Sequence, residues 1–185
     1  MEPETEVCTI HILCASGSGT STLGRALADR QGIRFFDTDD FYWKIKYSES
    51  HPVADRIALV DRALDGHERW VLSGSLCGWG DVFVPRFDLV LFVSLPPEIR
   101  MARLERREAD RYGDAILPGG ARYDQYRALM DWAVQYDTAG PEIRSTSGHE
   151  AWLQRLSCPV VRLEGDLSVE EKLDHVARLV PGLGR

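Results

Sequence analysis

The sequence predicts an α/β fold in three layers, with a five-stranded parallel sheet between two layers of helices. Five short apolar segments alternate with segments of helical composition along the 185 residues. Alternation of this kind is typical of a parallel sheet with helices on both faces. A glycine-rich turn follows the first apolar segment and leads directly into a helical one. We expect a single domain over residues 1–185, because a chain of this length buries a sizeable core and shows no repeat or linker.

The first half of the chain accounts for three of the strands. Residues 7–13 are nearly all apolar, so both faces of this strand should be buried. The helix after it ends at Gly32, and a later helix has apolar residues every three or four positions. The polar stretch 44–53 predicts an irregular segment. The expected elements are a strand at 7–13, a helix at 23–31, a strand at 33–36, a helix at 54–64 and a strand at 70–73.

The second half continues the alternation. Two consecutive prolines end the most apolar strand and start the next helix, and Ser168 is an N-cap residue followed by two acids. Polar stretches at 114–120 and 138–149 predict loops. The expected elements are a strand at 88–95, a helix at 97–112, a helical stretch at 123–136, a helix at 150–156, a strand at 160–163 and a helix at 168–180.

Composition excludes several classes of protein. The formal net charge is −7, which argues against nucleic acid or an anionic membrane as a partner. No stretch approaches the roughly 18 apolar residues of a membrane span, and the acidic N-terminus lacks the features of a signal peptide. The four cysteines are scattered without a C-x-x-C pair, which is typical of reduced thiols. We therefore expect a cytoplasmic protein, either a monomer or a homodimer.

The turn after the first strand predicts a phosphate-binding site. Glycines permit the backbone shape in which N–H groups surround an anion, and the following helix adds its positive N-terminal end. The alternative is an ordinary strand-to-helix turn. Two positions depart from the G-x-x-x-x-G-K-[ST] pattern, since Cys14 replaces the first glycine and Thr20 replaces the lysine. The expected nucleotide-binding residues of the turn are Ser16, Gly17, Ser18, Gly19, Thr20, Ser21 and Thr22, with Ser21 also a ligand of Mg²⁺.

The missing lysine bears on catalysis. Its ammonium group would offset negative charge that moves during phosphoryl transfer, whereas the Thr20 hydroxyl supplies no charge. Losing such a group costs on the order of 3 kcal/mol of transition-state stabilisation. Either another cation compensates or the loop binds a nucleotide without efficient turnover. The candidate cations are Arg103 and Arg107 and, with less support, Lys44 and Lys46.

Acidic residues follow the second strand, at the edge of a parallel sheet where ligands bind. Asp37, Asp39 and Asp40 could bind an acceptor hydroxyl, act as a general base or reach Mg²⁺ through water. The alternative is helix capping or a solvated loop. Because strands three and four end without an acid, Asp37 is the expected partner of Ser21 at the metal.

Further candidates lie after the third strand and on the arginine-rich helix. Ser75, Trp79 and Asp81 could line an acceptor pocket or pack a loop, and Trp43 belongs to an aromatic run that could stack on a planar ligand or cover the core. Arg103 and Arg107 are four residues apart and share one helix face. That face could equally be solvated. The expected acceptor residues are Asp39, Asp40, Trp43, Ser75, Trp79 and Asp81.

The motifs S-G-S-G-T-S-T-L, F-F-D-T-D-D, W-V-L-S-G-S and R-L-E-R-R resemble those of the nucleoside monophosphate kinase-like group of P-loop kinases. Adenylate, shikimate and gluconate kinases belong to this group. The resemblance spans nearly the whole chain and implies a P-loop fold with strand order 2-3-1-4-5. It also implies a small lid at about 108–145, nucleotide contacts from Arg103 and Arg107, and an adenine ring passing Gly165 and Asp166.

The resulting hypothesis is a phosphotransferase that uses ATP, or another nucleoside triphosphate, and Mg²⁺. The γ-phosphate would move to a nucleotide or a small hydroxylated metabolite, with Asp37, Asp39, Arg103 and Arg107 as catalytic residues. The alternative is a nucleotide-binding sensor or interaction protein with little kinase activity, because Thr20 stands in place of lysine. A third hypothesis is a slow NTPase linked to nucleic acid, and the acidic net charge of the protein disfavours it.

Overall fold

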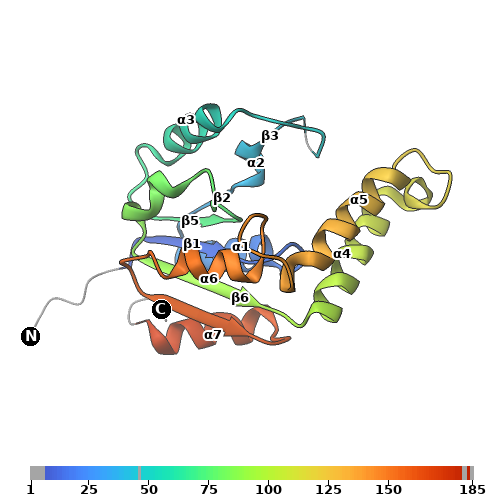
Figure 1. The fold of residues 1–185 in the computed structure, drawn as a ribbon. Coiled ribbons are helices and arrows are strands. Elements are labelled where there is room, and N and C mark those ends of the chain that lie inside the picture. The colour runs from blue at the N-terminus through green and yellow to red at the C-terminus, as the bar shows by residue number, and fades with distance from the viewer. Residues whose placement is uncertain (1–6, 46, 181–182, 184–185) are drawn as a thin grey trace, which may run out of the picture.

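The computed structural model describes residues 7–45, 47–180 and 183, and it contains the expected parallel sheet between helices (Figure 1). The order of the five strands is β2-β5-β1-β6-β7, and every neighbouring pair is parallel. Counted within this sheet alone, the order is the expected 2-3-1-4-5. The strands are β1 Thr9–Leu13, β2 Arg34–Asp37, β5 Trp70–Ser73, β6 Leu89–Ser94 and β7 Val160–Glu164.

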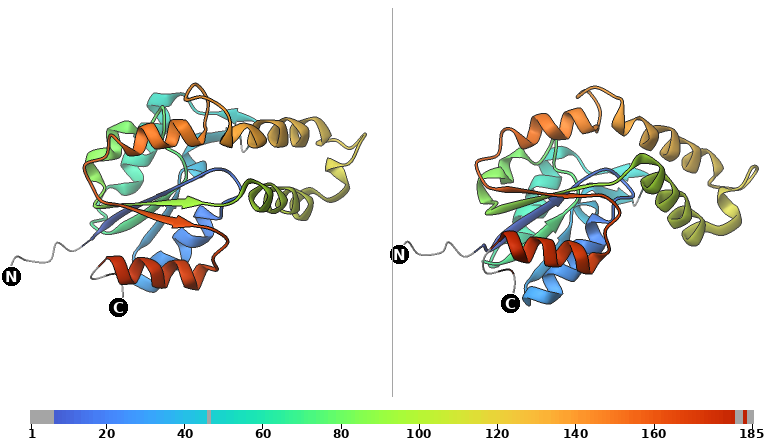
Figure 2. Two further views of the ribbon diagram at one scale, coloured as in Figure 1. Left: turned by 60° about the horizontal axis from the view of Figure 1, so that its bottom comes forward. Right: turned by 90° about the horizontal axis from the view of Figure 1, so that it is seen from below.

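Helices cover both faces of the sheet (Figure 2). Helices α1 (Thr20–Gln31) and α7 (Val169–Leu179) pack one apolar cluster against β1 and β6. Helices α3 (Val53–Leu64) and α6 (Thr146–Leu153) pack a second cluster, which includes Trp70, on the opposite face. The two clusters confirm the three layers. Ser168 caps α7 in a capping box, as its sequence predicts.

A small hairpin follows the second strand, where the sequence predicts an irregular segment. Helix α2 (Asp39–Tyr42) leads into β3 (Trp43–Ile45), which pairs antiparallel with β4 (Glu49–Ser50). Tyr47 occupies the turn with a φ of 62°. Strands of two and three residues are too short to show a period-2 pattern, so the hairpin has no sequence signal. The 3₁₀ helix η1 (Asp81–Arg86) was likewise not expected.

A helical arm projects from the carboxyl end of the sheet (Figures 1 and 2). It consists of α4 (Pro97–Tyr112), η2 (Gly113–Ile116), α5 (Tyr123–Ala133) and η3 (Val134–Asp137). We call residues 97–137 the arm. Arg100 joins its two sides, since its buried guanidinium donates to the Ala133 carbonyl at 3.0 Å and to Asp137 at 2.5 Å. The arm therefore has a fixed base.

Helix α6 begins at Thr146 rather than at the expected residue 150. Ser145 is its N-cap, because the Ser145 hydroxyl accepts a hydrogen bond from the Gly148 amide at 3.1 Å and donates one to the Gly140 carbonyl at 2.7 Å. The glycine and serines of this stretch favour a loop on composition alone, but they cap and start a helix here. The four cysteines, all of which lie among the described residues, form no disulfide bond with one another. Within the described part of the chain, no helix is long and apolar enough to cross a membrane.

Candidate active site

The turn between β1 and α1 has the backbone shape that an anion-binding loop requires. Gly17 and Gly19 have φ values of 88° and 82°, in the left-handed region that glycine favours. A β-carbon on Gly17 would lie 2.5 Å from the Arg100 carbonyl oxygen, so the loop packs tightly against the start of α4. Gly19 is the N-cap of α1, whose positive end therefore faces the loop.

The side chains of Cys14 and Ser18 stabilise the base of this loop. Both are buried, and the Cys14 thiol donates to the Ser18 hydroxyl at 2.9 Å. Burial raises the pKa of Cys14, so the thiol stays protonated and uncharged. Cys14 therefore packs beneath the loop as an uncharged side chain. Ser16 of the same loop lines the cavity that is described below.

Ser21 and Asp37 lie side by side at the start of α1 and the end of β2. The Ser21 hydroxyl donates to the Asp37 Oδ2 atom at 2.6 Å, and the Asp39 amide donates to Oδ1 at 3.1 Å. This is the pair that the sequence assigns to Mg²⁺. Among the described residues, no three acidic, histidine or cysteine side chains form a metal-binding group. The donors present therefore fit a hydrated Mg²⁺ held by one hydroxyl, one carboxylate and phosphate oxygens.

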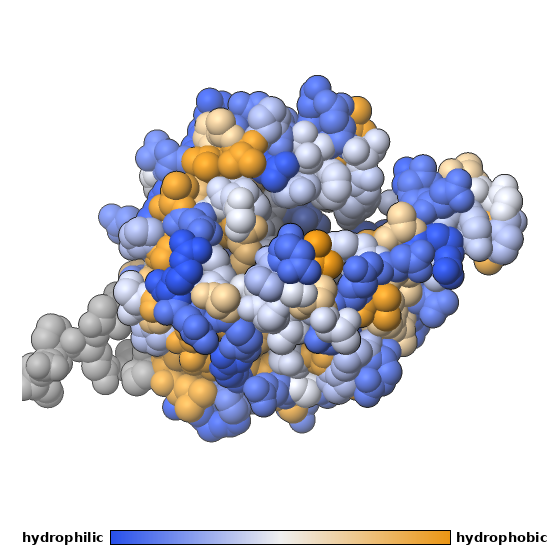
Figure 3. Space-filling view, viewed as in Figure 1, coloured by the Kyte–Doolittle hydropathy of each residue, from blue (hydrophilic) through white to orange (hydrophobic). Residues whose placement is uncertain are grey.

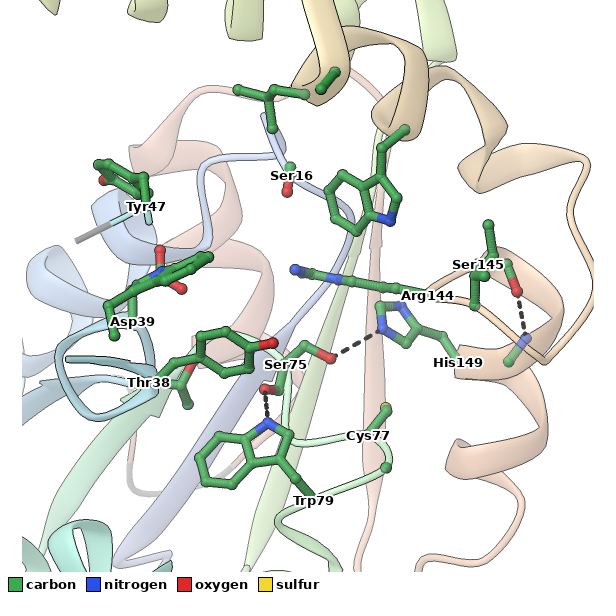
Figure 4. A pocket seen from close by; sticks show the side chains of 18 of the residues that line it. Ser16, Thr38, Asp39, Tyr47, Ser75, Cys77, Trp79, Arg144, Ser145 and His149 are labelled. Carbon is green, nitrogen blue, oxygen red and sulfur yellow. Dashed lines mark hydrogen bonds between the residues drawn. The ribbon is translucent and has the colours of Figure 1, made fainter. Parts of the chain in front are cut away.

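A cavity of about 890 Å³ opens next to the loop, between α2, the hairpin, the residues after β5, and the arm. On the surface, the molecule is hollowed between the part that holds the hairpin and the arm (Figure 3). Four of the expected acceptor residues line the cavity, two from α2 and β3 and two from the loop after β5. These are Asp39, Trp43, Ser75 and Trp79. Asp39, Ser75 and Trp79 are labelled in Figure 4.

The structure does not bring Asp40 and Asp81 to the cavity. Asp40 is exposed on α2 and is not among the lining residues. The Asp81 carboxylate accepts from the Trp152 Nε1 atom at 2.9 Å and pairs with Arg155 at 2.9 Å. It therefore joins η1 to α6, which corresponds to the packing alternative that the sequence left open.

Aromatic rings and one guanidinium form a wall of the cavity. Tyr42 packs edge-on against Trp43 and Trp79, with ring centres 4.8 and 6.3 Å apart. The Arg56 guanidinium lies 3.8 Å from the centre of the Tyr42 ring, and its Nε atom donates to the His51 carbonyl at 2.6 Å. Arg56 is thus held against the aromatic wall. Sequence reasoning missed it, because a single arginine in an amphipathic helix has no distinguishing pattern.

The two arginines expected to compensate for the missing lysine lie on different sides of the loop. Arg103 pairs with Asp166 at 2.5 Å, and its Nη1 atom lies 4.0 Å from where a β-carbon on Gly19 would be. Arg103 thus lies between the loop and the turn of Gly165 and Asp166. Gly165 has a φ of 85° and donates to the Ser94 carbonyl at 2.9 Å.

Two of the other predicted cations, Arg107 and Lys44, each pair with a carboxylate. Arg107 lines the cavity and pairs with Glu108 at 2.9 Å. Lys44 is exposed and pairs with Glu49 at 2.7 Å. Lys46 lies outside the described residues. In this arrangement the positive charges of Arg103, Arg107 and Lys44 each face a carboxylate.

Arg144 was not predicted, and it lies at the centre of the cavity (Figure 4). Its Nη2 atom donates to the Cys14 carbonyl oxygen at the start of the glycine loop. Its Nε atom is buried and has no hydrogen-bond partner. Burial lowers the pKa of Arg144, while the charge of Asp39 acts in the opposite direction. A lone arginine in a polar stretch, 130 residues from the loop, has no sequence signal that links it to the loop.

His149 packs beside Arg144 without adding a charge. Its Nδ1 atom shares a hydrogen bond of 2.7 Å with the Tyr136 hydroxyl, and its Nε2 atom lies 3.4 Å from the Ser75 hydroxyl. Burial is the main cause that lowers the pKa of His149, to about 3, and the neighbouring Arg144 contributes. At neutral pH the imidazole is therefore uncharged and links α6, the arm and the loop after β5.

The chain has the three-layer α/β fold seen in P-loop kinases, as comparisons with known proteins show. No family model matches the chain. A shikimate kinase structure from Acinetobacter baumannii aligns with a TM-score of 0.58 at 17% identity, covering 96% of this chain and 94% of that one, which shows a common fold. The chain belongs to the same family as the uncharacterized protein YqaC of Bacillus subtilis (strain 168), with 47% identity over 167 residues, 90% of this chain and 94% of that protein.

A more distant sequence relative is a named kinase. The cytidylate kinase of Archaeoglobus fulgidus is 28% identical over 108 residues. The match covers 50% of this chain and 57% of that protein, so the chain spans about half the length of this relative. The relatives with a named activity are thus kinases, as the sequence motifs imply.

Proposed function

We propose that this protein is a phosphotransferase that moves the γ-phosphate of ATP, with Mg²⁺, to a small hydroxylated acceptor. One observation supports this above the others. The Ser21–Asp37 pair stands at the helix N-terminus behind the glycine loop, and Asp39 follows one turn later on the cavity side. A metal-binding pair and an acceptor-side carboxylate thus stand at one junction, which suits in-line transfer between two bound molecules.

On the nucleotide side, the loop amides and the start of α1 would bind the phosphates. Mg²⁺ bound at Ser21 and Asp37 would neutralise charge on the phosphate oxygens. Arg103 lies at the outer side of Gly19 and Arg107 on the cavity side, so both could reach the phosphates when the arm closes. The turn of Gly165 and Asp166 is the proposed border of the adenine site.

On the acceptor side, Asp39 favours a hydroxyl group over a phosphate. A carboxylate repels an anionic acceptor oxygen, whereas it can take the proton of an alcohol. The acceptor oxygen would form a bond to the γ-phosphorus while the bond to the bridging oxygen breaks and ADP leaves. The proton would pass to Asp39. The wall of Tyr42, Trp43 and Trp79 suits an acceptor with a planar or apolar ring.

The test is acceptor-dependent release of ADP. The purified protein is assayed with ATP and Mg²⁺ against nucleosides, aromatic alcohols, polyols and nucleoside monophosphates. We expect turnover with one class of alcohol, and a new phosphate ester visible by phosphorus NMR. If the phosphate were transferred only to nucleoside monophosphates, Asp39 would not be the general base. Absence of turnover on every acceptor would rule out the proposal.

A second candidate is a nucleotide-binding protein with little turnover, and Thr20 is the observation that favours it. Thr20 is the first residue of α1 and brings no positive charge to the loop. This candidate predicts tight binding of ATP without acceptor-dependent release of ADP. Calorimetric titration with ATP, run beside the turnover assay, separates the two.

A further inference from the structure

Under the proposed function, the glycine loop requires a nearby cation, and no residue of the loop itself supplies one. Charge moves between the transferred phosphoryl group and the leaving ADP during transfer, and a fixed positive group nearby stabilises it. Thr20 cannot supply that charge. Arg103 and Arg107 face the carboxylates of Asp166 and Glu108 in this structure. They also belong to the arm rather than to the body of the protein.

Arg144 contacts the loop from the cavity. Its guanidinium donates to the carbonyl of Cys14, the first residue of the loop. It lines the cavity together with Ser16 of the loop and Asp39 of the acceptor side (Figure 4). The cation therefore lies between the two groups of the proposed transfer, the phosphates on the loop and the acceptor at Asp39.

The surroundings of Arg144 favour the binding of an anion. Within the part of the chain that the structure describes, no carboxylate forms an ion pair with it, and its buried Nε atom has no partner. Its neighbour His149 is neutral at physiological pH. A guanidinium that no carboxylate contacts directly is costly to bury, and a bound anion offsets that cost. The anion that the adjoining loop is shaped to bind is a phosphate.

The position of Arg144 does not depend on the arm. It directly precedes Ser145, whose side chain caps α6 and bonds to the Gly140 carbonyl. Helix α6 in turn packs on the sheet through Trp152 and Leu153. Arg144 therefore lies next to the capped end of a helix that packs on the sheet and does not belong to the arm.

We propose that Arg144 is the catalytic cation of this loop and binds the β- and γ-phosphates in place of a lysine at position 20. This inference rests on the proposed function and assigns to Arg144 the task expected of Arg103 and Arg107. The same guanidinium could instead bind an anionic group of the acceptor, and the experiment separates these two sources of anion.

The experiment combines removal of the charge with its return at position 20. Calorimetry measures binding of Mg²⁺ and a non-hydrolysable ATP analogue to wild type, Arg144→Gln, Arg144→Met, Thr20→Lys and the double variant Thr20→Lys/Arg144→Gln. Arg155→Gln is the matched control, since Arg155 also lines the cavity but is paired with Asp81. Melting temperatures without ligand show whether each variant is folded.

We expect both Arg144 variants to bind the analogue at least about thirtyfold more weakly, as the loss of a charged hydrogen bond predicts. Thr20→Lys should restore at least about tenfold of that loss in the Arg144→Gln background and should gain less in the wild-type background, where Arg144 already binds the phosphates. A merely structural role of Arg144 predicts equal gains in the two backgrounds. Arg155→Gln should bind like wild type. The melting temperature of Arg144→Met should equal or exceed that of wild type, because an unpaired buried charge is removed.

Two results would overturn the inference. One is unchanged affinity of both Arg144 variants for the analogue, and a raised KM for the acceptor in the turnover assay would then assign Arg144 to the acceptor. The other is a double variant that binds the analogue more weakly than Arg144→Gln alone. If wild type itself bound no nucleotide, the proposed function would fail as well, which distinguishes that outcome from the others.

Discussion

At the scale of single residues, the contact between Ser21 and Asp37 makes a direct prediction about Mg²⁺. The two side chains are 2.6 Å apart, so under the proposed function each would orient the other as a metal ligand. Ser21→Ala and Asp37→Asn should each lower kcat at least about hundredfold and raise the Mg²⁺ concentration needed for half-maximal rate. Titration of the rate with Mg²⁺ measures both effects. Asp29→Asn is the control, because Asp29 is exposed near the far end of α1.

His149 predicts how stability depends on pH. Its pKa is lowered from 6.5 to about 3 in the folded protein. Below about pH 6.5 the unfolded chain takes up a proton that the folded chain does not, so the free energy of unfolding falls as pH falls. The loss from this residue is about 1.4 kcal/mol per pH unit between the two pKa values.

Replacing His149 removes this contribution while leaving that of His11, whose pKa is lowered to about 4 by burial. The difference in unfolding free energy between wild type and His149→Gln should therefore shrink between pH 6.5 and pH 4.5. Urea denaturation at several pH values measures it. A constant difference across that range would contradict the assignment of His149 as buried and neutral.

At the scale of elements, Arg100 holds the two helices of the arm together. Its buried guanidinium bonds to the Ala133 carbonyl and to Asp137, and it lies 5.1 Å from the centre of the Tyr136 ring. Arg100→Ala should destabilise the protein by about 3 kcal/mol, since buried hydrogen bonds and packing are lost together. Urea denaturation gives this value. Arg106→Ala, at an exposed position of the same helix, should change stability by less than about 0.5 kcal/mol.

At the scale of the whole molecule, the arm and the hairpin face each other across the cavity. Arg111 of the arm donates to the Tyr47 hydroxyl of the hairpin at 3.1 Å, in an exposed hydrogen bond. We expect binding of Mg²⁺ and an ATP analogue to slow amide exchange in residues 108–133 by about tenfold or more as the arm closes. Hydrogen exchange with and without the analogue measures this. Equal exchange in both states would exclude the arm as a lid.

Much of the architecture could be predicted from local sequence. The alternation of apolar strands and helices, the stop at Gly32 and the cap at Ser168 all depend on neighbours within a few residues. The β3–β4 hairpin and the start of α6 could not be predicted, because their hydrogen bonds form in segments without periodicity. The candidate site divides in the same way. The glycine turn follows from local sequence, whereas the pairing of Asp81 with Arg155 depends on packing.

Local sequence accounts for the fold class, for the glycine turn after β1 and for the absence of a lysine at position 20. These are properties of residues that are close together in the chain, and local backbone preferences decide them. Which cation contacts the loop depends on tertiary packing. Arg103 and Arg107 share a helix face but turn toward acidic partners, while Arg144 reaches Cys14 from 130 residues away. Folding alone places α6 beside β1, and with it a buried guanidinium beside the loop.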